Sequence, residues 1–240
     1  MLRAIKILLL LGLLGVAALL LYGHARSHPE DLPWTRLDLA QPVGAFTGRK
    51  LAALGGEGAQ CRALLRRAGV RFTALPSRSE GAQCGYQDAV RLRAGGALDV
   101  AYAPADLGTS CPVAAALALW EWHVVQPAAI RHFGAEVARI EHFGSYSCRR
   151  LYGRSEGQWS EHASANAIDV AGFRLADGRR VSVLGDWHDA DEKAAFLRDV
   201  RDGACPLFAT VLSPDYNAAH RDHFHFDQAD RGEWGWRGCR

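Results

Sequence analysis

The chain has 240 residues, of which 22% are charged, and its formal net charge is +2 at neutral pH. This length accommodates one sizeable domain with a short appendage. The basic residues are scattered along the sequence, without the excess that a nucleic-acid-binding surface requires, so composition argues against nucleic acid as a partner.

The first two dozen residues have the pattern of an export signal. Basic residues precede an apolar run from Ile7 to Tyr22, and Arg26 follows it. A basic start and an apolar centre are typical of a secretory segment, and the run is about as long as the shortest membrane-spanning helices. We predict an uncleaved anchor in the inner membrane over residues 5–22, with cleavage after Ala25 as the alternative.

Composition divides the chain into three parts. Residues 1–25 are the predicted signal-anchor or signal peptide, residues 26–44 carry prolines among polar residues and are a predicted tether, and residues 45–240 form one domain. Because basic residues at the N-terminus favour the inner side of a membrane, the domain is expected outside.

Six cysteines follow the apolar run, and an even number in an exported domain indicates disulfides. They are Cys61, Cys84, Cys111, Cys148, Cys205 and Cys239. The simplest expectation is sequential pairing, which joins Cys61 to Cys84, Cys111 to Cys148 and Cys205 to Cys239. No C-x-x-C spacing occurs, which disfavours a redox motif or a zinc knuckle.

Hydrophobic patterns and turn residues predict interleaved helices and strands after the tether. Helices are expected over about 47–55, 58–68, 113–133 and 191–201. Pro127 should break or kink the third of them. Strands are expected over about 70–75, 89–93, 98–103, 137–143, 167–175, 180–184, 207–212 and 222–227. Because hairpin signals such as Asp177-Gly178 dominate, we predict an α+β fold in which an antiparallel sheet floors the site and helices pack around it.

The sequence His220-Arg221-Asp222-His223-Phe224-His225 lies on the last predicted strand. Residues two apart on a strand face the same side, so His223 and His225 project together while Phe224 and Phe226 face the core. The economical interpretation is that one of the two histidines binds a metal ion and the other moves protons.

A second motif supplies two further candidate ligands, His162 and Asp169. A short run of small residues lies between them. Three protein ligands with an open position are typical of a catalytic zinc site, whereas a structural site has four. An isolated histidine is more often an ordinary surface or core residue, but the combination of His162, Asp169 and His225 with His220 and His223 favours a metal site. Two imidazoles and a carboxylate suit zinc, although manganese or cobalt could substitute.

These motifs carry a family resemblance. The pattern S-x-H-x-x-x-x-A-x-D followed by H-x-H is similar to the signature of zinc peptidases that include D-Ala-D-Ala carboxypeptidases, lysostaphin-type peptidases and penicillin-insensitive murein endopeptidases. Across nearly the whole exported region the chain resembles the bacterial extensin-like C-terminal domain family. The segments that carry this resemblance are 111–112, 120–128, 144–149, 160–169 and 214–225.

The resemblance implies roles for individual residues. His162, Asp169 and His225 fall on the zinc-ligand positions, and His223 falls on the catalytic histidine. Arg149 falls where the carboxypeptidase branch places an arginine for the substrate carbonyl or the oxyanion, and its alternative is a structural salt bridge beside Cys148. Two further residues are site candidates. Either His220 or Asp222 could orient His223, and Ser160 could contact substrate.

The chain also departs from the peptidase pattern. Ala165 stands where the motif usually has glycine, and the E-x-W-H that supplies the carboxypeptidase general base is missing. His223 is therefore expected to act as the general base, as in the endopeptidase branch.

The expected function is a periplasmic zinc peptidase that acts on peptidoglycan stem peptides or cross-links. The alternatives are a non-catalytic wall-binding protein of the same fold, with some of its seven tryptophans stacking on glycan or peptide, and a metal-dependent hydrolase of another amide or ester.

Overall fold

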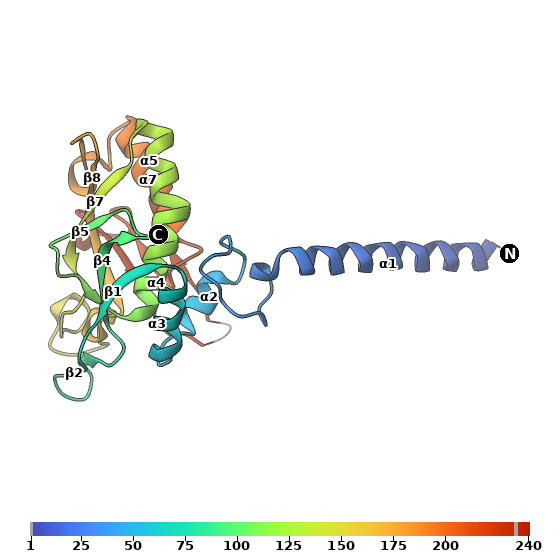
Figure 1. Cartoon of the computed structure of the whole chain (residues 1–240), viewed down its shortest axis with the longest axis horizontal. Helices are drawn as coiled ribbons and strands as arrows, with labels where there is room; N and C mark the ends of the chain where they lie inside the picture. Colours follow the sequence, from blue (N-terminus) through green and yellow to red (C-terminus); the bar gives the residue numbers. More distant parts are fainter. Residues whose placement is uncertain (1, 233–234) are drawn as a thin grey trace.

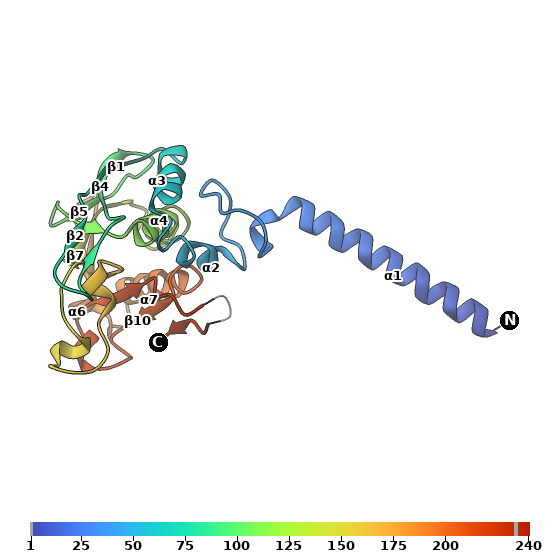
Figure 2. The ribbon, with the colours of Figure 1, turned by 90° about the horizontal axis from the view of Figure 1, so that it is seen from below.

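The computed structural model describes residues 2–232 and 235–240. A long N-terminal helix, α1 (Leu2–Ser27), stands apart from a domain in which helices and strands are interleaved (Figures 1 and 2). The predicted α+β class is confirmed, with mixed rather than purely antiparallel sheets.

Helix α1 buries none of its residues against the domain. Its 26 residues have a mean hydropathy of 2.7 over the most apolar window, and they span about 39 Å at ~1.5 Å per residue. The hydrocarbon core of a bilayer is about 30 Å thick. The helix therefore fits a signal sequence or a membrane anchor.

The predicted tether is packed on the domain in part. It forms a short 3-10 helix, η1 (Pro29–Asp31), and Leu39 is only 2% exposed within the core. Lys50 of α2 (Thr47–Ala52) donates through Nζ to the Thr35 hydroxyl at 2.8 Å and to the Glu30 carbonyl at 3.2 Å. These contacts hold the segment after α1 against α2.

The largest sheet has the strand order β12-β10-β11-β8-β7-β5, with β9 paired to β8. Its strands are β5 (Ala101–Ala103), β7 (Val137–Gly144), β8 (Ala167–Leu175), β9 (Arg180–Ser182), β10 (Thr210–Leu212), β11 (Phe224–Asp227) and β12 (Gly238–Cys239). The central pairs are antiparallel, while β5 runs parallel to β7 and β12 runs parallel to β10.

Two smaller sheets complete the strand set. One has the order β1-β4-β6, from β1 (Val70–Ala74), β4 (Val90–Gly96) and β6 (Gly108–Thr109). The other pairs β2 (Arg78–Ser79) with β3 (Gly85–Tyr86). Two-residue strands carry no hydrophobic periodicity, which explains why sequence patterns did not predict β2, β3, β6 or β12.

The long central helix is continuous rather than broken. It runs through α4 (Cys111–Trp120), a π-helical turn η2 (Glu121–Val125) and α5 (Gln126–Phe133). Ser110 caps its start by accepting from the Val113 N–H at 3.4 Å. Pro127 has no N–H to donate within the helix, and its ring crowds the preceding turn. The wider π turn just before it accommodates the ring and the missing hydrogen bond, so the helix continues.

Aromatic residues join this helix to one face of the large sheet. Trp120 contacts Phe173 and Phe226, with ring centroids 5.9 and 5.2 Å away, and its indole N–H donates to the Val200 carbonyl at 2.8 Å. Phe196 of α7 (Glu192–Ala204) packs on Phe173 from the same side. The helices thus cover one face of the sheet and leave the other for polar side chains.

The predicted pairing of the cysteines is wrong for two of the three disulfides. The structure joins Cys61 to Cys111 and Cys84 to Cys148, whereas the expected bond between Cys205 and Cys239 is present. Cys61 lies on α3 (Gly58–Arg67), which packs against the start of α4, so the first bond links two helices. The second bond ties the β2–β3 hairpin to the segment after β7. Only the tertiary fold brings these segments together.

The other predicted elements are present with shifted ends. Helix α7 begins after Asp191, whose side chain accepts from the Lys193 and Ala194 N–H groups. The expected strand over 180–184 ends at Ser182, where the short helix α6 (Val183–Asp186) begins.

Candidate metal centre

Two neighbouring strands place a carboxylate and an imidazole side by side. His225 on β11 is the direct cross-strand partner of Asp169 on β8. Their sequence neighbours Ile168, Phe224 and Phe226 are fully buried toward the helices. Because side chains alternate along a strand, Asp169 and His225 project from the opposite face of the sheet, as the sequence predicts.

The third candidate ligand, His162, lies in a 3-10 turn, η4 (Glu161–Ser164), just before β8. The Ser160 hydroxyl caps this turn by accepting from the His162 N–H at 3.3 Å. Ala165 ends it in the left-handed conformation with φ of 55°, a backbone conformation that favours glycine. The Ala165 carbonyl accepts from the Ser110 N–H and from the Thr109 and Ser145 hydroxyls, which fixes the turn despite the strained residue.

Three potential ligand atoms converge. His162 Nε2 lies 3.1 Å from Asp169 Oδ1 and 3.2 Å from His225 Nδ1, and His225 Nδ1 lies 3.0 Å from Asp169 Oδ1. Ligands bound to zinc at about 2.0–2.1 Å in a tetrahedron are roughly 3.3–3.4 Å apart. The triangle of atoms therefore fits a small tetrahedral cation with little adjustment.

The second nitrogen of each imidazole is also engaged. His162 Nδ1 lies 2.6 Å from the Ser145 carbonyl, to which it donates, and His225 Nε2 lies 3.2 Å from Asp227 Oδ2. Such partners fix the tautomer and the orientation of a metal-binding histidine. Sequence reasoning missed both partners, although Asp227 follows His225 by two positions on one strand and so shares its face.

The electrostatics of the cluster favour a cation. Burial raises the pKa of Asp169, but hydrogen bonds from His162 and His225 outweigh it and hold that pKa far below its usual range. Burial lowers the pKa of His225, but hydrogen bonds to Asp169 and Asp227 raise it to about 9. In the metal-free protein the cluster therefore carries a proton that a bound metal ion would displace.

The proposed proton-transfer histidine, His223, lies beside the triangle. Its Nε2 is 3.5 Å from Asp169 Oδ1, and its Nδ1 is 2.8 Å from Asp222 Oδ1. Since the Asp222 carboxylate accepts the Nδ1 proton, the Nε2 lone pair points toward the cluster, where a general base would need it. Asp222 thus makes the orienting contact that the sequence suggested for either Asp222 or His220.

His220 lies at the end of the turn η5 (Ala218–His220) and packs against His223 and His225, with ring centroids 5.3 and 6.0 Å away. Its Nδ1 lies 2.8 Å from Asn217 Oδ1. Burial and the neighbouring histidines lower its pKa to about 4, so the ring is neutral at pH 7.

Arg149 reaches the rim of the cluster. Its Nη2 lies 3.9 Å from Asp169 Oδ2, and its side chain is 46% exposed. This long, half-exposed contact leaves most of the guanidinium donors available to a ligand.

Asp186 and Trp187, at the end of α6, make contacts within the fold. Asp186 accepts from the Ser182 N–H at 2.7 Å and pairs with Lys193 at 3.2 Å. The Trp187 indole donates to Asp215 Oδ1 at 2.9 Å.

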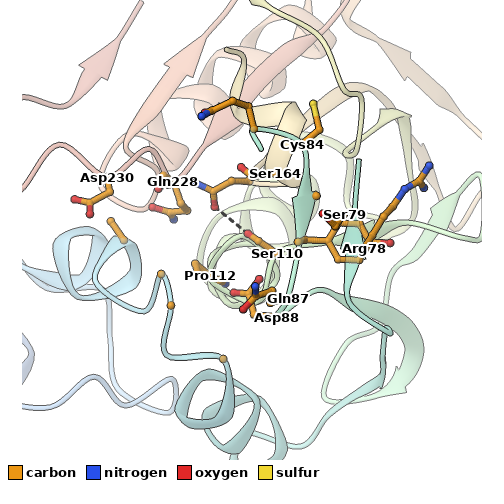
Figure 3. A pocket seen from close by; sticks show the side chains of 18 of the residues that line it. Arg78, Ser79, Cys84, Gln87, Asp88, Ser110, Pro112, Ser164, Gln228 and Asp230 are labelled. Carbon is orange, nitrogen blue, oxygen red and sulfur yellow. Dashed lines mark hydrogen bonds between the residues drawn. The ribbon is translucent and has the colours of Figure 1, made fainter. Parts of the chain in front are cut away.

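A polar cavity of about 640 Å³ adjoins the turn that carries His162 (Figure 3). Ser110 and Asn166 meet in it, with the serine hydroxyl donating to the amide oxygen at 2.9 Å. Gln228 also lines it; this residue is 2% exposed, and its Oε1 has no hydrogen-bond partner among the described residues. Amides and hydroxyls of this kind suit a polar ligand.

Comparison with known proteins gives one match. The family model described as "Extensin-like protein C-terminus" matches residues 59–240, a range that includes every residue of the cluster. No curated protein and no solved structure matches the chain.

Proposed function

The chain belongs to the extensin-like protein C-terminus family, and from this premise and the geometry of the cluster we propose that it is an exported zinc-dependent peptidase. The proposed substrates are the stem peptides or cross-links of peptidoglycan, in the periplasm.

The observation that carries the proposal is the convergence of His162, Asp169 and His225. Three ligand atoms lie within 3.2 Å of one another, and both imidazoles are oriented by a second hydrogen bond. Burying a carboxylate beside two imidazoles is unfavourable without a compensating partner, so such clusters occur chiefly where a metal ion or a reaction uses them.

The surrounding residues support hydrolysis. A zinc ion held by the three ligands would polarise a carbonyl group and make water acidic enough to attack near neutral pH. His223, oriented by Asp222, can accept a proton at Nε2 and return it to the leaving amine. Arg149, at the rim, can stabilise the negative charge that develops on the carbonyl oxygen.

Two features favour peptidoglycan as the substrate. The apolar helix α1 fits export or anchoring, which would place the domain beside the wall. The polar cavity beside Ser164, in the turn that follows His162, could accept the hydrophilic remainder of a wall fragment. The similarity of the metal motif to murein peptidases points the same way.

The second candidate is a wall-binding protein without turnover. Trp236 is 65% exposed and could stack on a sugar or peptide. Trp234, the other tryptophan near the C-terminus, lies outside the described residues. The complete ligand set argues against this candidate, because a protein that only binds has no need of it.

The test is digestion of purified peptidoglycan by the full chain in detergent, with zinc or with a chelator, read as muropeptide masses. Chelator-sensitive loss of cross-linked dimers would identify an endopeptidase, and loss of a terminal residue would identify a carboxypeptidase. His162→Ala and His225→Ala should each abolish zinc binding at the cluster and hydrolysis, whereas the exposed His188→Ala should change neither. A folded, zinc-loaded protein that binds peptidoglycan but releases nothing would favour the wall-binding alternative.

A further inference from the structure

A second group of side chains with metal-binding chemistry lies where α1 meets the domain (Figures 1 and 2). His28, Glu30 and Asp31 each offer a ligand atom, and these atoms lie within 4.8 Å of one another. His28 Nδ1 is 3.0 Å from Glu30 Oε1. The group belongs to the segment that follows the apolar helix, so its residues are different from those of the candidate metal centre on β8 and β11.

His24 adds a fourth potential ligand to this group. The His28 N–H donates to the His24 carbonyl at 2.8 Å, which extends the last turn of α1 to His28. Residues four apart lie on one face of a helix, and the centroids of these two imidazole rings are 4.6 Å apart. His24 Nε2 also lies 3.8 Å from Asp31 Oδ2. Two imidazoles and two carboxylates are therefore gathered in one place.

Contacts with the domain backbone fix the two carboxylates. The Ala45 N–H donates to Asp31 Oδ1 at 2.7 Å, and Oδ2 is the oxygen that faces His24. Gly44 packs so closely that a Cβ there would lie 2.7 Å from Asp31 Oδ1 and 2.6 Å from the Glu30 carbonyl carbon. Carboxylates that bind a metal ion are themselves held by hydrogen bonds of this kind. The acids are thus held by the domain, whereas the two histidines continue the anchor helix.

One positive charge lies near the acids. Lys50 interacts electrostatically with Glu30 and Asp31, but its Nζ donates to the Glu30 carbonyl at 3.2 Å and to the Thr35 hydroxyl at 2.8 Å. Lys50 therefore offsets part of the acidic charge, and its hydrogen bonds go to neutral oxygens. The carboxylate oxygens that face the imidazoles remain available as ligands.

We propose that this group is a structural zinc site that joins the end of the anchor helix to the domain. A structural zinc ion takes four protein ligands, whereas a catalytic one takes three and keeps an open position. Two imidazoles and two carboxylates supply four, from ligand types that suit zinc.

The exposure of the histidines shows why an ion would matter here. The side chains of His24 and His28 are 60% and 49% exposed, and ion pairs at such positions stabilise a protein little. Ligand atoms up to 4.8 Å apart exceed the roughly 3.3–3.4 Å expected around tetrahedral zinc, so the rings must move inward by about 1 Å. Exposed imidazoles can do so by rotation, and the bound ion would then fix the direction in which the domain leaves the membrane.

The experiment counts the zinc ions bound to each chain by inductively coupled plasma mass spectrometry, on the full chain in a nonionic detergent after dialysis against buffered zinc. We expect two ions in the wild type, one at each site. His28→Gln should lose one ion, and so should Glu30→Gln, which keeps the size of the side chain and removes its charge. His188→Gln, the same change at an exposed histidine outside the group, should keep both ions.

The variant His162→Ala separates this proposal from the proposed peptidase site, because it should lose the ion of that site and keep the other. A single ion that is lost in His162→Ala and kept in His28→Gln would overturn the structural site and leave the peptidase proposal intact. A single ion with the opposite behaviour would support the structural site alone. Equal losses in His28→Gln and His188→Gln would indicate nonspecific binding to histidine and would overturn the site.

Limited proteolysis with trypsin tests the link between helix and domain. Arg26 is exposed and lies between the two histidines. Zinc should slow cleavage after Arg26 about tenfold, because a bound ion raises the free energy of opening this segment. His28→Gln should be cleaved at the same rate with and without zinc, and a short peptide substrate controls for effects of zinc on the protease. Zinc that binds to the wild type without slowing this cleavage would overturn the link.

Discussion

The two histidines of the cluster present different ring nitrogens to it, His162 through Nε2 and His225 through Nδ1. The partner of the other nitrogen decides which one is presented. A backbone carbonyl of Ser145 holds His162, whereas the Asp227 carboxylate holds His225. A carboxylate partner makes an imidazole a better metal ligand, so Asp227 should tune the affinity of the proposed zinc site.

This contact gives the first prediction. Asp227→Asn should weaken zinc binding by about 10–100-fold, because an amide cannot supply the negative charge that stabilises the imidazole. Zinc affinity is measured by chelator competition on the full chain. Asp230→Asn, a change of the same chemistry three residues away, should not alter the affinity. Equal affinities for Asp227→Asn and the wild type would show that Asp227 does not support the metal ligand.

Another buried acid lies in the core, in the π turn of the central helix. Glu121 is fully buried, and its Oε1 accepts from the Asp99 and Val100 N–H groups at 2.6 and 3.1 Å. Its Oε2 has no hydrogen-bond partner among the described residues. Burial raises its pKa from 4.5 to about 7, because the charged form is poorly solvated there.

The second prediction follows from this pKa. Between about pH 4.5 and pH 7 the unfolded chain has lost the Glu121 proton while the folded chain keeps it, so the contribution of Glu121 to stability falls by about 3 kcal/mol as the pH rises. The lowered pKa of His220 contributes in the opposite direction, so the Glu121 effect is the difference between the wild-type profile and that of Glu121→Gln. Glu121→Gln should remove this fall. Urea unfolding of the metal-free protein across the range measures it, and the exposed Glu136→Gln should follow the wild type. A wild-type profile unchanged by Glu121→Gln would refute the assignment.

At the scale of elements, the C-terminal strand shows how a short segment is held against the large sheet. Strand β12 has only two residues, Gly238 and Cys239, and it pairs with β10 at the edge of the large sheet. The Arg240 carbonyl accepts from the Ser213 N–H at 2.8 Å, and the disulfide from Cys239 reaches Cys205 at the end of α7. The disulfide adds a covalent restraint to these few strand contacts.

The third prediction concerns this bond. Replacing Cys205 and Cys239 by serine should lower the free energy of unfolding by about 3–4 kcal/mol, from the loop entropy that the bond removes in the unfolded chain. Replacing Cys61 and Cys111, which are both fully buried, should cost more, because it also places hydroxyl groups in the core. Denaturant unfolding of both double variants measures the two losses. The reverse order of losses would contradict this reasoning.

At the scale of the whole molecule, one helix is unlike the rest. The apolar side chains of helix α1 are exposed. A second described helix, Cys111–Phe133, is also long and apolar enough to span a membrane, but 67% of its most apolar window is buried. The second is the core helix of the domain. Exposed apolar surface of the size of α1 is unstable in water, so this helix requires a membrane or removal.

The fourth prediction distinguishes these fates. If α1 is an uncleaved anchor, the protein sediments with membranes, resists extraction by alkaline carbonate, and has an intact mass that includes residues 1–25. A soluble protein whose mass begins at Arg26 would show cleavage instead.

The sequence by itself determined the apolar first helix, most helices and longer strands, and His162, Asp169 and His225 as partners. Periodicity and capping residues act over a few residues and so predict the elements. The three candidate ligands lie in two separate motifs, and they were grouped by their ligand chemistry and by the resemblance of these motifs to a known signature. The tertiary structure alone decided that Cys61 pairs with Cys111 and Cys84 with Cys148, and that Ser145 and Asp227 support the two histidines of the cluster. Each of these joins segments far apart in the chain or depends on the direction of a side chain, and local patterns hold no information about either.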